Sequence, residues 1–372
     1  VLAASVPKRW GCKVIDIKTA FLNTALPDSF ETVFVRPPQA LVEFGLVPTG
    51  TLWKVLKAIY GLRIAPKAWG VERDKQFKRM EIRVKGQKYV FQQSHIDPSV
   101  WMIVRGCVGA EAPGSAKGGI MAKAVGRPLH DTFFPEVAES AAFGYLVIYV
   151  DDFLVVSDDP FIDAVRDKLR ETWQITDKPT VNFGSSLSVE YLSVNITAEK
   201  SGWFLDQGVY CQDLLAKWSM AECRAIGSLE DVQEQLEDEA EQEPDSGDVR
   251  QAQRLAGGLN WLATRTRPDI SFVVSQLSSA ATRAPIRAIA LGKKCLRYLA
   301  GTREHGIRLH AEAQHSQGSG SPKLLEAFGD ASYETGYAQT GVLVKYCGMT
   351  IMWQSSKQPQ VPRSTAESEC TA

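Results

Sequence analysis

The chain has 372 residues, 44% hydrophobic and 23% charged, which predicts a globular protein with a sizeable core and two or three domains. Its apolar runs are too short to cross a bilayer, and its seven cysteines form no CxxC pair, which argues against a zinc site or a disulfide framework. The net charge of −1 hides a basic front part: residues 1–105 carry 17 Lys/Arg against 8 Asp/Glu, typical of nucleic-acid binding or of a solvated basic face.

The first predicted element is a buried strand in Lys13–Phe21, which ends at Asp16 and turns into a short helix. Leu52–Trp69 follows, with a tight turn at Tyr60-Gly61 and a stop at Pro66. Polar or glycine-containing turns therefore separate the apolar segments of the front part.

The remaining elements follow from apolar period and composition. In chain order they are a helix at 69–80, a strand at 100–104, an inserted Gly/Ala/Pro-rich loop at 105–142, two apolar runs at 145–156, a helix at 162–175, strands at 188–196 and 202–206, a helix at 207–220, an acidic linker insertion at 229–248, helices at 249–265 and 286–299, a flexible joint at 314–321, strands at 324–329, 341–345 and 350–354, and the start of a helix at 364–372.

The segment Gly144–Asp159, GYLVIYVDDFLVVSDD, is the most informative part of the chain. Two short apolar runs flank Asp151-Asp152, which predicts a β-hairpin with this acidic dipeptide at its tip. Adjacent carboxylates repel each other, and a bound cation would offset that cost. Oxygen ligands without Cys or His favour Mg²⁺. An ordinary exposed turn is the alternative interpretation.

Asp16 ends a predicted strand about 135 residues before the acidic tip. Three carboxylates brought together hold two Mg²⁺ ions, which is the chemistry needed for phosphoryl transfer. Because neighbouring side chains on a strand alternate, Asp16 and Asp151 are the expected main ligands and Asp152 a supporting one.

Several segments resemble, in order, the reverse transcriptases of copia-type retrotransposons. The segments are DIKTAFLN at 16–23, AIYGLRIAPKAW at 58–69, YVDD at 149–152, LATRTRPDI at 262–270, KCLRYLAGT at 294–302, FGDAS around Asp330 and the final SSKQPQVPRSTAESECTA. The resemblance covers nearly the whole chain except 105–142 and 229–248. It implies a nucleotidyltransferase that adds dNTPs to a primer 3′ end on an RNA or DNA template, with Mg²⁺, or alternatively Mn²⁺, as cofactor.

The resemblance also implies roles for single residues. Asp16, Asp151 and Asp152 match the catalytic metal ligands, and Phe21 matches the position whose ring excludes a ribose 2′-hydroxyl. Tyr60, Gly61 and Arg63 match the segment beside the incoming nucleotide and template.

Further matches lie in the rear half. Glu190–Ile196 resembles the hairpin that grips the primer end, although Ser193 replaces the usual glycine. Asp330 and Glu369 match the first two catalytic carboxylates of the RNase H domain, and ECTA fits the family's E-x-x-A helix start better at Glu369 than at Glu367. The family's two further acidic residues lie beyond Ala372, so we expect no RNase H activity from this chain alone.

The resemblance implies an α+β fold with a reverse-transcriptase palm, a helical thumb/connection and a partial RNase H-like α/β domain. The expected regions are 1–206 (partial fingers and palm, with the insertion 105–142), 207–313 (thumb/connection, with the acidic insertion 229–248) and 314–372 (linker and truncated RNase H-like domain). Other Pol or Gag segments are expected partners, a membrane is not, and the family works in cytoplasmic particles or the nucleus.

Two alternatives stay open from the sequence. A decayed or fragmentary retrotransposon remnant would bind nucleic acid without catalysis, and the reduced set of basic residues before Asp16 favours a fragment. A carboxylate-metal hydrolase would explain the acidic pair but not the ordered segments. Primer extension distinguishes the polymerase from both.

Overall fold

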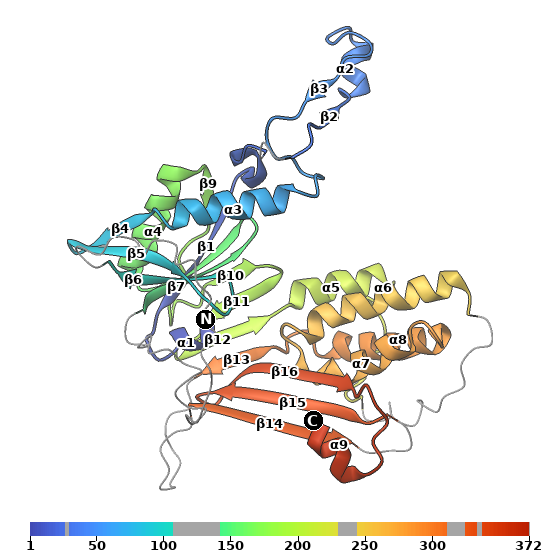
Figure 1. The fold of residues 1–372 in the computed structure, drawn as a ribbon. Coiled ribbons are helices and arrows are strands. Elements are labelled where there is room, and N and C mark those ends of the chain that lie inside the picture. The colour runs from blue at the N-terminus through green and yellow to red at the C-terminus, as the bar shows by residue number, and fades with distance from the viewer. Residues whose placement is uncertain (27–29, 107–141, 230–243, 311–323, 333–336, 372) are drawn as a thin grey trace, which may run out of the picture. The chain divides into compact units, whose positions relative to one another are not determined.

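The computed structural model describes residues 1–26, 30–106, 142–229, 244–310, 324–332 and 337–371. The chain divides into two compact units, one formed by Val1 and residues 10–180 and the other by residues 2–9 and 181–372. Both units combine antiparallel sheets with helices (Figure 1), so the α+β class predicted from the sequence is confirmed. No helix among these residues is long and apolar enough to cross a membrane.

The first unit is built on a seven-stranded sheet in the order β4-β5-β6-β7-β8-β1-β9. Its strands are β1 (Gly11–Ile17), β4 (Glu81–Val84), β5 (Gln87–Gln93), β6 (Val100–Arg105), β7 (Ala142–Tyr149), β8 (Asp152–Ser157) and β9 (Ile175–Asp177). The neighbouring strands pair antiparallel. Although β1 comes first in sequence, it lies between β8 and β9, and this order brings Asp16 to the hairpin that contains Asp151.

Helices α3 (Ala65–Phe77) and α4 (Asp159–Thr172) contribute to one core with a single face of this sheet. Phe77 lies at the centre of an aromatic cluster, with its ring centroid 5.1 Å from that of Trp101 and 5.8 Å from that of Phe153. Pro66 lies in the first turn of α3, where its missing N–H costs no helical hydrogen bond. The prediction that Pro66 stops an element is therefore wrong, because a helix begins there.

A small arm extends from the first unit (Figure 1). It contains β2 (Phe34–Val35), β3 (Trp53–Lys54) and α2 (Gln39–Glu43), and it follows the short 3₁₀ helix η1 (Ala20–Asn23). The arm was not predicted, because its strands have two residues each and leave apolar side chains such as Phe34 and Trp53 exposed.

The second unit begins with α1 (Leu2–Ser5) and a four-stranded sheet formed by β10 (Ser188–Tyr191), β11 (Val194–Ala198), β12 (Gly202–Asp206) and β13 (Ile307–His310). The single strand predicted at 188–196 is wrong, since Leu192 and Ser193 form a turn between β10 and β11. Their φ angles of +51° and +61° fit a type I′ hairpin turn. Ser193 thus adopts the left-handed conformation that a glycine would adopt without strain.

Helices α5 (Gly208–Lys217), α6 (Ser246–Ala263), α7 (Ser271–Ala280) and α8 (Pro285–Gly301) share a second apolar core. The short 3₁₀ helix η5 (Pro268–Ile270) joins α6 to α7. The guanidinium of Arg267 is buried here, and it donates to the Asp269 carboxylate at 2.7 Å and to the Thr302 carbonyl oxygen at 2.8 Å. These bonds tie the α6–α7 connection to the end of α8.

A three-stranded antiparallel sheet completes the second unit, with β14 (Leu325–Ser332), β15 (Gln339–Tyr346), β16 (Met349–Lys357) and the helix α9 (Thr365–Thr371). The indole Nε1 of Trp353 donates to the Ala263 carbonyl oxygen at 2.6 Å and ties β16 to α6. The buried amide of Gln358 donates to Ser368 at 2.9 Å and holds α9.

The three segments predicted as insertions or linkers lie mostly outside the described residues, which exclude 107–141, 230–243 and 311–323. The functional boundaries near 206 and 313 stay a prediction.

Candidate functional site

Asp16 and Asp152 stand opposite each other on neighbouring strands. β1 pairs antiparallel with β8, and the register places Asp16 across from Asp152. Directly opposed residues of an antiparallel pair project to the same face of the sheet. Ile15, Ile17 and Phe153 alternate with them and are buried in the helix-covered core, so both carboxylates lie on the other face, where they are partly exposed.

The hairpin between β7 and β8 turns through Val150 and Asp151. Tyr149 pairs with Asp152, which makes Asp152 the first residue of β8. The predicted tip of Asp151-Asp152 is therefore wrong by one residue. Val150 has a φ of +53°, and a left-handed conformation costs an L-residue about 1–2 kcal/mol. Contacts outside the two-residue loop have to offset this strain.

Two hydrogen bonds from outside the hairpin hold the turn. The indole Nε1 of Trp69 donates to the Val150 carbonyl oxygen at 2.7 Å, and the backbone N of Ile17 donates to the Asp151 carbonyl oxygen at 2.9 Å. Trp69 is not among the site residues predicted from the sequence. The available signal was its place at the end of AIYGLRIAPKAW, the segment that resembles a motif of the family.

The carboxylates of this site act on one another electrostatically. Burial and the nearby Asp151 carboxylate raise the pKa of Asp16 above its ordinary value, against the opposing effect of Lys18 and Lys178. Burial, Asp151 and Asp16 raise the pKa of Asp152 in the same way, again opposed by Lys178. The three predicted carboxylates are thus close enough to influence one another, and Lys178, which no sequence motif indicated, lies near Asp16 and Asp152.

The carboxylates of this site are the right ligands for a hard divalent cation, but they lie too far apart to bind one as they stand. Carboxylate oxygens are the ligands that Mg²⁺ and Mn²⁺ prefer, and a cation would relieve the mutual repulsion of Asp16, Asp151 and Asp152. Within the described ranges, however, no three His, Cys, Asp or Glu side chains are grouped closely enough to hold a metal ion. A bound ion would therefore have to draw the carboxylates together.

Phe21 and Tyr60 form an aromatic pair beside these carboxylates. Their ring centroids are 4.6 Å apart with the planes tilted by 58°, and Phe21 is 7% exposed. Burial raises the pKa of Tyr60, as do the charge of Asp151 and the hydrogen bond that the Tyr60 hydroxyl donates to it. The predicted positions Phe21, Tyr60 and Asp151 are thus neighbours in space.

Gly61 and Arg63 follow Tyr60 in the turn before α3. Gly61 has a φ of +94°, which favours glycine, and the side chain of Arg63 is exposed. Arg63 is therefore free to meet an anionic ligand from solvent.

The two downstream carboxylates lie in the last sheet and its helix. Asp330 is exposed on β14, where it pairs with Gly341, and it lines a cavity of about 340 Å³. Glu369 is exposed on α9. Glu367 instead takes part in capping α9: its backbone N donates to Ser364 Oγ at 3.2 Å, and its carboxylate accepts from the backbone N of Arg363 at 2.6 Å. The assignment of Glu369 as the second carboxylate stays a prediction.

Comparison with known proteins identifies the relatives of this chain. No protein-family model matches it. The Pol polyproteins of the transposons RE1 from Arabidopsis thaliana and TNT 1-94 from Nicotiana tabacum are 26% and 24% identical to it, over 99% and 96% of its length. The chain is a homologue of copia-type retrotransposon Pol polyproteins.

The chain spans about a fifth of the length of its plant relatives, since the match covers 21% of the RE1 polyprotein and 23% of the TNT 1-94 polyprotein. A transposon Ty5-1 protein of Saccharomyces cerevisiae is 25% identical, and there the match covers 95% of this chain and 96% of the yeast protein.

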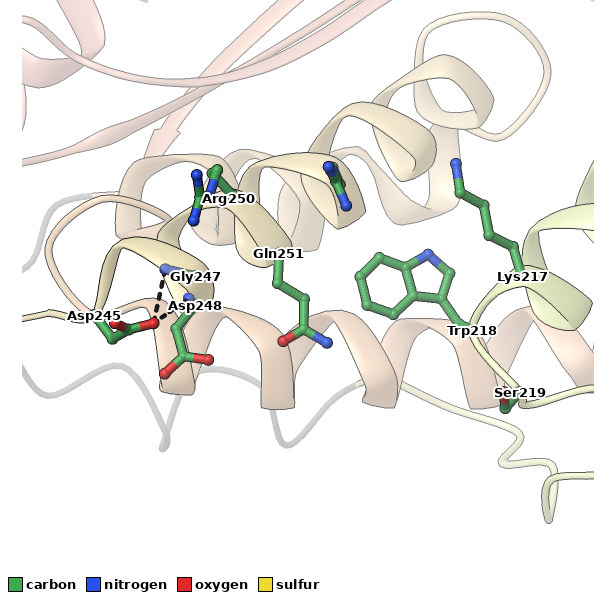
Figure 2. A pocket seen from close by; sticks show the side chains of 9 residues that line it. Lys217, Trp218, Ser219, Asp245, Gly247, Asp248, Arg250 and Gln251 are labelled. Atoms are coloured by element: carbon green, nitrogen blue, oxygen red, sulfur yellow. Dashed lines mark hydrogen bonds between the residues drawn. The ribbon is translucent and has the colours of Figure 1, made fainter.

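A basic cavity lies in the second unit, between the end of α5 and the start of α6 (Figure 2). It measures about 760 Å³ and is lined by the cations Lys217, Arg250 and Arg254 and by the indole of Trp218. These cations form no ion pair with a described residue. The carboxylates of Asp245 and Asp248 also line the cavity, and that of Asp245 caps α6 by accepting from the backbone N of Gly247 at 2.7 Å. Because the cations outnumber the carboxylates, the cavity carries a small excess of positive charge beside an aromatic ring.

The repulsion among the carboxylates predicts how stability depends on pH. A carboxyl whose pKa is raised in the folded state is ionised at neutral pH at a cost in stability, and this cost disappears as pH falls through that raised pKa. Asp151→Asn removes a cause of both shifts, so without divalent ions we expect this variant to melt above the wild type near neutral pH. The difference should shrink toward about pH 4, close to the ordinary carboxyl pKa.

Thermal melting of both proteins across this pH range is the measurement. An advantage of the variant that grew as the pH fell would contradict the repulsion.

Proposed function

We propose that this chain is the reverse transcriptase part of a copia-type Pol polyprotein, an RNA-directed DNA polymerase that adds dNTPs to a primer 3′ end. The observation that carries the proposal is the placement of Asp16 on β1 opposite Asp152 of β8, beside Asp151 in the β7–β8 turn. Homology to Pol polyproteins over 99% of the chain supports the same function.

Each site residue has a role in this proposal. Asp16 and Asp151, supported by Asp152, would hold Mg²⁺ or Mn²⁺. When bound, such ions lower the pKa of an attacking hydroxyl and stabilise negative charge on the transferred phosphoryl group. Phe21 forms the floor under the sugar of the incoming nucleotide, and Tyr60 packs against it.

Gly61 and Arg63 complete the nucleotide site. Gly61 supplies the turn that places Tyr60, and the exposed guanidinium of Arg63 offers donors to a phosphate.

The proposed architecture follows the two units. The seven-stranded sheet is the palm and the arm that carries β2 and β3 is part of the fingers, while α5–α8 form the thumb and connection. The sheet β14–β16 with α9 is the beginning of an RNase H-like domain, in which Asp330 and Glu369 are the first two carboxylates. Template, primer, dNTPs and other Pol or Gag segments are the proposed partners.

Primer extension on an RNA template tests the proposal. We expect the purified chain to incorporate complementary dNTPs onto a DNA primer in the presence of Mg²⁺, and a DNA template provides a second substrate. Binding of the primer–template without extension, with either ion and either template, would contradict polymerase activity.

The basic cavity predicts a nucleic-acid contact in the proposed thumb. Lys217 and Arg254 present charges that suit backbone phosphates, and the ring of Trp218 suits a stacked base or sugar (Figure 2). We expect Lys217→Ala and Arg254→Ala each to weaken primer–template binding and to reduce the salt slope of log K by about one. Fluorescence anisotropy over a range of salt concentrations measures both.

The matched control is Lys168→Ala on α4, because the Lys168 ammonium already pairs with Glu171 at 2.8 Å. An equal loss of affinity in this control would show that general basicity, rather than the cavity, determines binding.

A further inference from the structure

We propose that Trp69 is a positioning residue for Asp151, which it keeps in place through the β7–β8 turn. Trp69 belongs to α3, whereas the turn lies about eighty residues later in the chain, so the two segments meet only in the fold. The consequences for catalysis rest on the proposed function, whereas the consequences for the turn itself do not.

The contact between Trp69 and the turn is direct, and the Trp69 side of it is buried. The indole Nε1 lies 2.7 Å from the Val150 carbonyl oxygen, and the Trp69 side chain is 1% exposed. Its ring packs edge-on against Trp173 at a centroid distance of 5.4 Å, which fixes the direction in which the N–H points. Because the indole is buried and held in this direction, its removal breaks the bond to the Val150 carbonyl group without offering another protein donor in its place.

The turn needs such a contact because of its own sequence. Two-residue hairpin loops with positive φ usually contain glycine or asparagine, but here a β-branched residue, Val150, has a φ of +53°. Trp69 holds the carbonyl group of Val150, and the backbone N of Ile17 holds the carbonyl group of Asp151. Both peptide units of the strained turn are therefore anchored from outside the hairpin.

The position of Asp151 follows from these anchors. Its carboxylate accepts the hydrogen bond of the Tyr60 hydroxyl and repels Asp16 and Asp152, so electrostatics alone would push it away from the other two acids. If the Val150 peptide rotates, Asp151 leaves this position. The indole N–H of Trp69 thus opposes both the strain of the turn and the repulsion among the carboxylates.

Trp69→Phe tests the proposal, because it keeps a buried ring and removes only the N–H and part of the ring volume. We expect hydrogen–deuterium exchange of the segment 145–157 to become about tenfold faster. Under the proposed function we also expect a 10- to 100-fold lower kcat (about the cost of misplacing a reacting group by 1 Å), with the KM for dNTP changed by less than about threefold.

Trp101→Phe is the matched control. Trp101 is fully buried in the same aromatic cluster as Phe77, and its Nε1 has no hydrogen-bond partner among the described residues. This variant loses the same ring volume and an N–H group that donates no hydrogen bond. It should therefore lower the melting temperature without changing hydrogen–deuterium exchange at the turn or kcat.

A second substitution tests whether the effect passes through the turn. Glycine adopts a positive φ without strain, so Val150→Gly should restore slow exchange, and kcat with it, in the Trp69→Phe background. Wild-type exchange in Trp69→Phe, equal effects of Trp69→Phe and Trp101→Phe, or failure of this rescue would each overturn the proposal. If the wild type extends no primer, the proposed polymerase fails, and the exchange measurements still decide the role of Trp69.

Discussion

Replacing Asp151 with asparagine should lower the rate of primer extension by about 10³-fold, on the scale of losing one preorganised electrostatic group. Asparagine has nearly the same size, and the bond from the Ile17 backbone N goes to the carbonyl oxygen of residue 151, so the turn itself should persist. The loss would come from one missing negative charge near Asp16 and Asp152. Single-nucleotide incorporation at saturating Mg²⁺ measures it.

Two further measurements separate this loss from a defect in folding or binding. Mg²⁺ should raise the melting temperature of the wild type and have little effect on Asp151→Asn, because a ligand stabilises only the state that binds it. Primer–template affinity should be unchanged in the variant. Asp163→Asn is the control, since Asp163 is a surface carboxylate of α4 that pairs with Arg166. Equal incorporation by wild type and Asp151→Asn would refute the role of Asp151 as a metal ligand.

The convergence of Asp16 with Asp151 and Asp152 could be predicted because each acid ends or begins an apolar run in a motif of recognisable order. The geometry of the turn could not. Its register depends on the pairing of Tyr149 with Asp152, and turn propensity gives no reason to place Val150 at a positive φ. The conformation results from tertiary contacts that no local pattern encodes.

Some elements were missed although the sequence contained a signal. The hairpin of β4 and β5 turns at Lys85-Gly86, both with positive φ, and Ile82 and Val84 alternate with polar residues before it. For the helix α7, in contrast, the sequence contained no clear signal. The helix α7 has the serine-rich sequence SFVVSQLSSA, whose helical period is short and weak, and it is stabilised by packing in the second core.

The sugar specificity of the proposed polymerase should depend on Phe21. Its ring is nearly buried and lies 4.6 Å from the ring of Tyr60, so it cannot retreat from a 2′-hydroxyl placed against it. Phe21→Val removes most of that ring, and we expect the preference for dNTP over rNTP, as a ratio of kcat/KM values, to fall by about 10²-fold. The substitution should also cost on the order of 2 kcal/mol in stability, because it leaves a cavity beside Tyr60.

Two conservative variants separate the steric effect from general damage to the site. Phe21→Tyr keeps a ring at this position and should keep the preference for dNTP, whereas Tyr60→Phe keeps the ring that supports Phe21 and removes only the hydroxyl bonded to Asp151. If the fall in discrimination comes from lost ring volume, only Phe21→Val should incorporate rNTP efficiently. Equal discrimination in wild type and Phe21→Val would instead mean that another residue contacts the sugar, because a valine side chain is too short to fill the same space.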